Sequence, residues 1–260
     1  MELLDASATK DLAGVSFVLC DLDDTLTLDG ALPQASYAAL ANLVRKGRQV
    51  IIVTGRPAGW CDMIARLWPV AAVVGENGAF YFRYDRQSRR MMREFQRSAE
   101  QRRADQSRLS EIFQQVQKKH PGVRLAADQA FRISDYAVDF CEDVSPLPQG
   151  VVSDIVHLFE AHGATAKVSS IHVNAWIGDF SKLQMSLSVL ESLGLAEREF
   201  RRRVAYVGDS PNDEPMFEYF PLSVGVANIR SFLSSMKTHP RWITTQPGGL
   251  GFAELEGRME

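Results

Sequence analysis

The fold of this 260-residue chain is decided by Val15-Ser16-Phe17-Val18-Leu19-Cys20-Asp21-Leu22-Asp23-Asp24-Thr25-Leu26-Thr27. Its first six residues form a short, mostly apolar run that favours β-structure, as is typical of a strand buried in a parallel sheet. Side chains alternate along an extended chain, so Asp21 and Asp23 project to one side. They therefore face the crevice at the carboxyl end of the strand, where open α/β sheets bind ligands.

The two carboxylates repel each other unless a cation or a shared proton relieves the repulsion. Hard oxygen ligands select Mg²⁺, which commonly arrives with a phosphate. The alternative is an acidic turn without chemistry, in which Asp24 or Thr25 caps a helix.

Strands and helices alternate on both sides of a long central segment. Helical spacing of apolar residues and short apolar runs predict a parallel sheet with helices on both faces, a Rossmann-like α/β fold. The predicted strands cover 15–20, 50–53, 70–74, 204–207 and 223–227, and the predicted helices 36–46, 61–67 and 182–193. Gly248-Gly249-Leu250-Gly251 lacks the context of a dinucleotide site and is interpreted as a loop.

The central segment has a different texture and predicts an inserted α+β unit. Its first part, 86–120, is rich in Arg and Gln and carries one apolar helical face, and strand-like stretches follow near 123–127, 136–141 and 166–176. We therefore predict one sheet domain, 1–84 and 180–260, interrupted by an inserted domain, 85–179.

Three further motifs fall where the predicted sheet binds ligands. Thr54-Gly55-Arg56 follows the second strand, where a hydroxyl and backbone N–H groups suit a phosphate oxygen, although a plain βα loop has the same residues. Lys182 opens a helix against the helix dipole, which indicates a task such as neutralising phosphate, or else a surface lysine.

The last motif is Gly208-Asp209-Ser210-Pro211-Asn212-Asp213-Glu214-Pro215. A capping box formed by Ser210 and Asp213 is the plain interpretation, but Pro215 favours a helix that begins near residue 212 or 213. Asp209 is then left on a loop, free to bind metal. Together the motifs supply a metal site, a phosphate cradle and a carboxylate nucleophile, as phosphoryl transfer requires.

These motifs, in this order, resemble the haloacid dehalogenase superfamily. The insert resembles the C2-type cap of its IIB subfamily, and Val74-Gly75-Glu76-Asn77-Gly78-Ala79 is similar to a family segment that precedes that cap. Asp24 stands where many relatives carry Gly. The resemblance covers residues 15–84 and 180–253 closely, and the cap in position and length more than in sequence.

The resemblance implies an assignment of roles. Asp21 would attack phosphorus, and Asp23 would protonate the leaving alcohol and then activate water. Mg²⁺ would be held by an Asp21 oxygen, the Asp23 carbonyl and Asp209, with Asp213 orienting Lys182 or a metal-bound water. Thr54 and Lys182 would bind the phosphoryl oxygens, and Gly55, Arg56 and Asn212 are further candidate substrate-binding residues. A second Asp favours a phosphate ester over a halide, since halide needs no proton.

His172, Asn174 and Trp176 share one face of the alternating stretch 170–176. A polar face with an indole suits a hydroxylated ligand, although an ordinary half-solvated sheet face has the same pattern. We therefore include these three residues as candidate substrate-binding residues.

Composition limits the class of protein. Hydrophobic residues make up 45% and charged residues 23% of the chain, as in a globular protein, and the net charge of −3 lacks the basic excess of a nucleic-acid binder. No apolar run reaches the ~18 residues of a membrane span. The N-terminus lacks a signal-peptide pattern, and the three cysteines suggest neither disulfides nor a zinc site, so we expect a cytoplasmic protein.

The prediction is a Mg²⁺-dependent phosphatase acting on a small phosphorylated metabolite, a sugar or polyol phosphate. A phosphomutase or phosphotransferase on the same scaffold, and a non-catalytic regulator that binds phosphate compounds, are the alternatives.

Overall fold

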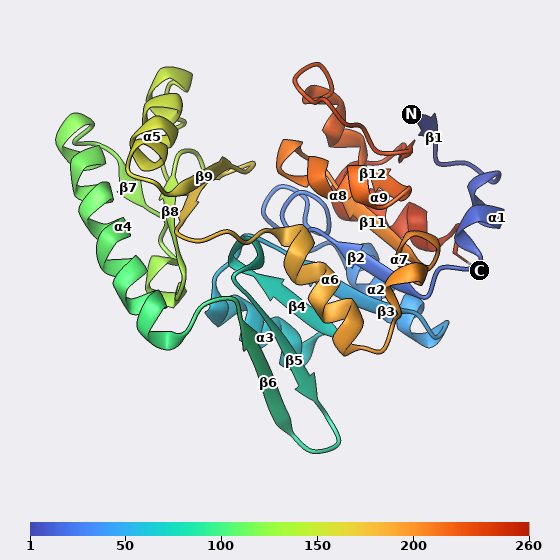
Figure 1. Cartoon of the computed structure of the whole chain (residues 1–260). Helices are drawn as coiled ribbons and strands as arrows, with labels where there is room; N and C mark the ends of the chain where they lie inside the picture. Colours follow the sequence, from blue (N-terminus) through green and yellow to red (C-terminus); the bar gives the residue numbers. More distant parts are fainter. Residues whose placement is uncertain (260) are drawn as a thin grey trace.

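The computed structural model describes residues 1–259, which contain a large and a small β-sheet (Figure 1). The large sheet has the order β1-β13-β12-β11-β2-β3-β4-β5-β6. In this order, all neighbouring strands from β1 through β13, β12, β11, β2 and β3 to β4 are parallel to each other. Strand β5 pairs antiparallel with β4, and β5 and β6 form an antiparallel hairpin at the edge. Its strands are β1 (Glu2–Leu3), β2 (Phe17–Cys20), β3 (Gln49–Val53), β4 (Ala72–Gly75), β5 (Phe80–Asp85), β6 (Arg90–Phe95), β11 (Val204–Gly208), β12 (Leu222–Gly225) and β13 (Trp242–Ile243).

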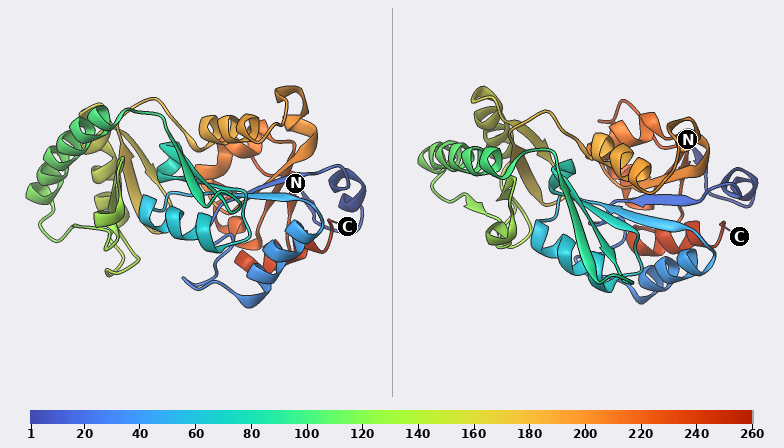
Figure 2. Two further views of the ribbon diagram at one scale, coloured as in Figure 1. Left: turned by 90° about the horizontal axis from the view of Figure 1, so that it is seen from below. Right: turned by 60° about the horizontal axis from the view of Figure 1, so that its bottom comes forward.

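Helices cover both faces of this sheet (Figure 2). The first face packs against α1 (Ala8–Leu12), α2 (Gln34–Arg45), α3 (Ala58–Leu67) and α9 (Gly248–Glu256), and the second against α6 (Lys182–Ser192), α7 (Glu197–Arg203) and α8 (Glu214–Tyr219). Along β2, Val18 and Cys20 join the first core, and Phe17 and Leu19 join the second. The predicted α/β fold is therefore confirmed.

The small sheet has the antiparallel order β7-β8-β10-β9 and lies on the left in Figure 1. Its strands are β7 (Arg124–Leu125), β8 (Asp135–Asp139), β9 (Thr165–Val168) and β10 (His172–Trp176), and its core includes residues of α4 (Ala99–Lys119) and α5 (Gln149–Ala161). We call residues 99–176 the cap. The predicted boundary at residue 84 falls within β5, and β6 extends the large sheet, so the division at 84 and 179 stays a prediction.

Two local predictions are wrong. The glycine-rich stretch at 248–251 opens helix α9 and is not a loop. A Cβ on Gly248 or Gly249 would collide with the carbonyl oxygens of Thr27 and Leu26, so glycine is required by close packing that a propensity argument does not detect. The stretch 166–176 is not one strand but two, β9 and β10, joined by a turn at 169–171.

No helix among residues 1–259 combines the length and the apolar character needed to cross a bilayer. The three cysteines, Cys20, Cys61 and Cys141, are free thiols.

Candidate active site

Parallel pairing brings the ends of three strands to one edge of the large sheet. Cys20 pairs with Ile52 on one side and Val207 on the other, so the residues after β2, β3 and β11 emerge together. These are Asp21, Thr54 and Asp209, each from a different predicted motif.

Asp21 and Lys182 meet in the centre of this edge. Lys182 Nζ donates to Asp21 Oδ1 at 2.8 Å and to Asp213 Oδ1 at 3.1 Å, and all three side chains are buried. Burial raises the pKa of Asp21 to about 7, with Asp213 adding to the shift and the Lys182 ammonium opposing it. Although burial lowers it, the pKa of Lys182 is raised overall by Asp21 and Asp213. The lysine is therefore a buried cation held by two acids, in place to neutralise a bound anion.

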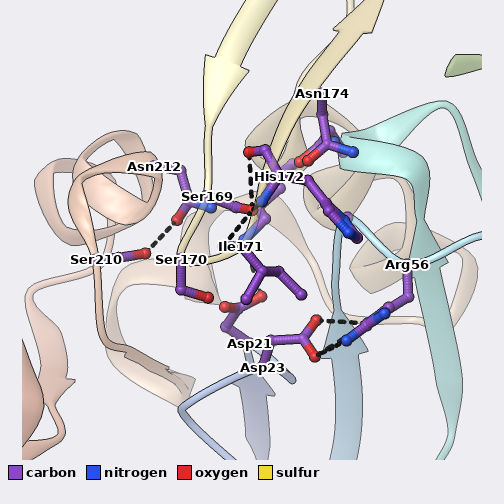
Figure 3. A pocket seen from close by; sticks show the side chains of 13 residues that line it. Asp21, Asp23, Arg56, Ser169, Ser170, Ile171, His172, Asn174, Ser210 and Asn212 are labelled. Carbon is purple, nitrogen blue, oxygen red and sulfur yellow. Dashed lines mark hydrogen bonds and ion pairs between the residues drawn. The ribbon is translucent and has the colours of Figure 1, made fainter. Parts of the chain in front are cut away.

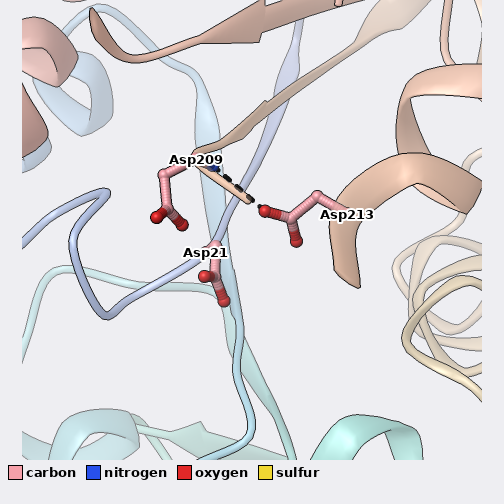
Figure 4. Close-up of side chains that lie close together, drawn as sticks. All are labelled: Asp21, Asp209 and Asp213. Carbon is pink, nitrogen blue, oxygen red and sulfur yellow. Dashed lines mark hydrogen bonds between the residues drawn. The ribbon is translucent and has the colours of Figure 1, made fainter. Parts of the chain in front are cut away.

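Asp21, Asp209 and Asp213 form a buried carboxylate group, with one oxygen of each lying within 4.8 Å of the others (Figure 4). Burial, followed by the charges of Asp213 and Asp21, raises the pKa of Asp209 well above its ordinary value. Three acids against one lysine leave an excess of negative charge. Oxygen donors around such an excess fit a hard divalent cation such as Mg²⁺.

Asp213 differs from the other two acids in that it already accepts several hydrogen bonds. Its Oδ1 accepts from Lys182 and, at 2.5 Å, from the Tyr206 hydroxyl, and its Oδ2 accepts from the backbone N–H groups of Asp209 and Ser210. We therefore place Asp21 and Asp209 as the carboxylates that would hold the ion, and Asp213 as their organiser. Direct ligation by Asp213 stays a prediction.

Asp23 lines the same cavity and is engaged by Arg56. Arg56 Nε lies 3.0 Å from both Asp23 oxygens, and Nη2 lies 2.9 Å from Oδ1 (Figure 3). The predicted phosphate-binding arginine is thus paired with carboxylates in this structure. The Asp23 side chain is not part of the three-acid group, and its role as a metal ligand stays a prediction.

Thr54 and Gly55 lie at the end of β3. The Thr54 hydroxyl is fully buried and accepts from the Arg56 N–H at 3.0 Å, which leaves its own proton for a phosphoryl oxygen. Gly55 lines the cavity, and a Cβ there would come 3.3 Å from the Asn77 amide, closer than most side chains tolerate. Asp24 has φ 54°, a left-handed conformation that explains why relatives use Gly there and why Asp is tolerated.

The turn at 169–171 covers the acids from the cap side (Figure 3). The cavity beneath it is lined by Asp21, Asp23, Gly55, Arg56, Asn77, Ser169, Ser170, Ile171, His172, Asn174, Lys182, Ser210 and Asn212. Only about 20 Å³ is open to water, which is room for ~1 molecule. A second chamber of about 120 Å³ adjoins it and is lined by Asn77, Trp176, Lys182, Asn212 and Met216, among others.

The three predicted cap residues are all buried on β10. His172 Nε2 lies 2.9 Å from Glu142 Oε2, and Asn174 donates to Asp135 Oδ2 at 3.3 Å. Trp176 stacks on Phe180, with 5.8 Å between ring centroids, and its indole N–H has no partner. His172 and Asn174 line the first chamber and Trp176 the second, so they do not form a half-solvated face.

The loop after β11 adds Asn212, whose Oδ1 accepts from the Ser210 hydroxyl at 3.0 Å. It lies in η3 (Pro211–Asp213), and Pro215 stands in the first turn of α8, as predicted. Asn212 lines both chambers.

Sequence reasoning missed the residues that organise the site. Tyr206, whose hydroxyl donates to Asp213, was predicted only as a residue of a strand. Asn228 donates to the Asp24 carbonyl at 3.0 Å but is remote from Asp24 in the sequence. Glu76, in η1 (Glu76–Gly78), is completely buried and accepts from the N–H groups of Ala58 and residues 133–135, which ties the cap to the large sheet. The sequence signal that could have identified Glu76 is an acidic residue within a mostly apolar segment, shortly before a glycine.

The family model for haloacid dehalogenase-like hydrolases matches residues 18–136. No curated protein matches the chain. Among solved structures, a protein of Thermoplasma acidophilum is 16% identical, with a TM-score of 0.70 over 94% of this chain and 99% of that one.

Two further structures match over 94% of this chain. A haloacid dehalogenase-like hydrolase from Bacteroides thetaiotaomicron is 15% identical, with a TM-score of 0.65 over 99% of its own chain. The sucrose-phosphatase of Synechocystis sp. PCC6803, solved with sucrose and phosphate, is 15% identical, with a TM-score of 0.63 over 96% of its chain. Residues 18–136 thus match the haloacid dehalogenase-like hydrolases, and the chain as a whole has the fold of these solved structures.

Proposed function

We propose that the protein is a Mg²⁺-dependent phosphatase of a small phosphomonoester, a sugar or polyol phosphate, and that it works through an aspartyl-phosphate. The observation that carries the proposal is the buried Asp21 at 2.8 Å from Lys182, with Asp209 beside it and Asp23 lining the same cavity. A carboxylate nucleophile, a cation for the phosphoryl group and a second acid are the groups that this reaction needs.

In the proposed reaction, an Asp21 oxygen attacks phosphorus and the bond to the leaving oxygen breaks. Asp23 gives its proton to that oxygen, and the alcohol departs. Asp23 then takes a proton from water, which attacks phosphorus and releases phosphate and the Asp21 carboxylate. Lys182 and Thr54 hold the phosphoryl oxygens. Mg²⁺, held by Asp21, Asp209 and the Asp23 carbonyl, would neutralise charge on the phosphoryl group.

The substrate class is inferred from the lining of the two chambers. Donors without partners, the Trp176 indole N–H and the Asn77 amide, lie beside His172 and Asn174. Indole faces and amide groups suit a hydroxylated leaving group. The sucrose-phosphatase of Synechocystis has this fold and was solved with a sugar and phosphate, which supports the same class here.

The cap, within the predicted insert 85–179, would exclude water and contact the leaving group. We also propose the reducing cytosol as the setting, since all three cysteines are free thiols.

The test is a screen for phosphate release over a panel of phosphomonoesters, with and without Mg²⁺, for the wild type and Asp21→Asn. We expect Mg²⁺-dependent release from sugar or polyol phosphates, abolished by Asp21→Asn. Transfer of the phosphoryl group to another hydroxyl without free phosphate would instead indicate a mutase or phosphotransferase. Binding without turnover would indicate a regulator, and release by Asp21→Asn at the wild-type rate would refute the nucleophile.

A further inference from the structure

Two spaces share lining residues with the first chamber, and their linings differ in charge. The second chamber shares three residues with it, Asn77, Lys182 and Asn212. A pocket of about 310 Å³, which we call the acidic pocket, shares three others, Asp23, Arg56 and Ile171. The charged groups that line the acidic pocket are four carboxylates and one guanidinium, those of Asp23, Asp24, Asp29, Glu142 and Arg56. An ester whose phosphate occupies the first chamber therefore has two different surroundings available for its leaving group.

The second chamber is lined by cations and hydrogen-bond donors. Among residues 1–259, its lining contains the ammonium groups of Lys167 and Lys182 and no carboxylate. Two buried donors in this lining have no hydrogen-bond partner within the same residues, the Trp176 indole N–H and the Asn77 amide. An anion accepts hydrogen bonds from ammonium, indole and amide groups alike. The lining therefore suits an anionic group better than a cationic one.

The position of Lys167 follows from the register of the small sheet. Lys167 on β9 lies opposite Asn174 on β10, and opposite residues of an antiparallel pair share one face of the sheet. Trp176 shares that face, because alternate residues of a strand point to the same side. Lys167 therefore projects from the face of the cap that lines the two chambers.

The two lysines of the second chamber differ in what they have left to bind. Lys182 is buried and already donates to Asp21 and Asp213. Lys167 is exposed, and within the described part of the chain its ammonium takes part in no ion pair or hydrogen bond. Because no other charge holds it, the Lys167 ammonium is available to pair with an anion on the substrate.

We propose that the leaving group of the substrate carries an anionic group, a carboxylate or a second phosphate, and that Lys167 binds this group in the second chamber. The inference names the class of substrate and rests on the proposed phosphatase function. Trp176 and Asn77 donate to the same leaving group. The four carboxylates of the acidic pocket repel an anion, so the charge of the leaving group also decides which of the two spaces it enters.

The first arm of the test compares esters that differ in charge. 3-Phosphoglycerate differs from glycerol 3-phosphate only in a carboxylate that replaces a hydroxymethyl group, and 6-phosphogluconate differs from sorbitol 6-phosphate in the same way. Fructose 1,6-bisphosphate against fructose 1-phosphate tests a second phosphate as the source of the charge, and phosphoethanolamine offers a cationic leaving group. With Mg²⁺ and the wild type, we expect kcat/KM to be at least about tenfold higher for an acid ester than for its neutral partner, as a hydrogen bond to a charged group provides.

The second arm tests whether Lys167 is the source of the preference. The variants are Lys167→Gln, Lys167→Arg and the matched control Lys118→Gln, an exposed lysine on α4 that lines none of these three spaces. For Lys167→Gln we expect kcat/KM to fall at least about tenfold more for the acid ester than for its neutral partner. Lys167→Arg keeps the charge and should retain most of the preference, and Lys118→Gln should resemble the wild type.

Equal kcat/KM within every pair, or a preference for phosphoethanolamine, would overturn the proposal, and so would a preference that Lys167→Gln leaves unchanged. Thermal unfolding checks that each variant is folded, and Lys167→Met takes the place of Lys167→Gln should the latter not fold. Release of phosphate from neutral esters alone would overturn this proposal and leave the phosphatase function standing. A wild type that releases phosphate from no ester of the panel would refute the phosphatase function, and the role of Lys167 with it.

Discussion

The hydroxyl of Tyr206 provides a quantitative test of how the acid group is organised. Tyr206 is completely buried on β11, and its hydroxyl donates to Asp213 Oδ1 at 2.5 Å. Tyr206→Phe removes this donor and keeps the ring, whose centroid lies 5.5 Å from that of Phe217. Asp213 retains Lys182 and two backbone donors, so the loss is one hydrogen bond to a charged group.

Such a bond contributes ~1.5–3 kcal/mol, so we expect the free energy of unfolding to fall by about 2 kcal/mol. For a chain of this size the unfolding midpoint should drop by ~4–8 °C. Urea unfolding with an unchanged m-value would show that stability alone has changed.

The matched control is Tyr37→Phe, since Tyr37 is 40% exposed and touches Trp68 through its ring. A surface change of this kind should stay within ~0.5 kcal/mol. If the two variants lose the same stability, Asp213 does not depend on the tyrosine, and our account of how the acids are held is wrong.

Three further predictions concern the cap contact, acid stability and the ion. Glu76→Gln removes one of the two oxygens that accept from Ala58 and residues 133–135, so at least one buried N–H loses its acceptor. We expect limited proteolysis near residue 133 to accelerate and the free energy of unfolding to fall by ~1–3 kcal/mol. Unchanged cleavage would contradict this. A histidine ring, then a guanidinium, lower the pKa of Glu142 from 4.5 to about 2, so the carboxylate stabilises the fold above pH 4.5 and this is lost as the pH falls toward 2. After allowance for solvent screening, wild type and Glu142→Gln should converge in unfolding free energy by about 1–2 kcal/mol over that interval, and a constant difference would contradict the shift. Mg²⁺ at ~100 times its Kd should stabilise the wild type by ~2.7 kcal/mol in thermal unfolding but leave Asp209→Asn nearly unaffected, and equal stabilisation would place the ion elsewhere.

Much of the large sheet follows from local pattern. Apolar runs before Asp21, Thr54 and Asp209 predict parallel strands, and parallel strands bring their carboxyl ends to one edge, so these residues were expected to converge. Their meeting with Lys182, 161 residues from Asp21, needed the family resemblance as well, because a lysine at a helix start has no partner that the sequence reveals.

The remainder depends on packing between distant segments. The glycines that open α9 were predicted to form a loop, because the sequence does not show how closely they approach residues 26 and 27 in the folded protein. No sequence pattern singled out Glu142, because its contact partner Arg56 is 86 residues away. Likewise, alternation placed His172 on the same face as Trp176 but could not show that both are buried in separate chambers.

The contacts that hold the cap on the large sheet are of two kinds, and they differ in what they can release. Glu76 and Arg132 join backbone groups across the junction, since Arg132 Nη1 donates to the Gly55 carbonyl at 2.9 Å, so they support the cap whether or not substrate is present. Arg56, in contrast, contacts Asp23 and Glu142 and lines a cavity with room for ~1 water molecule. The turn at 169–171 lines the same cavity, whereas Glu76 does not. We therefore expect a sugar phosphate to displace the turn and to disturb the Arg56 contacts before those of Glu76.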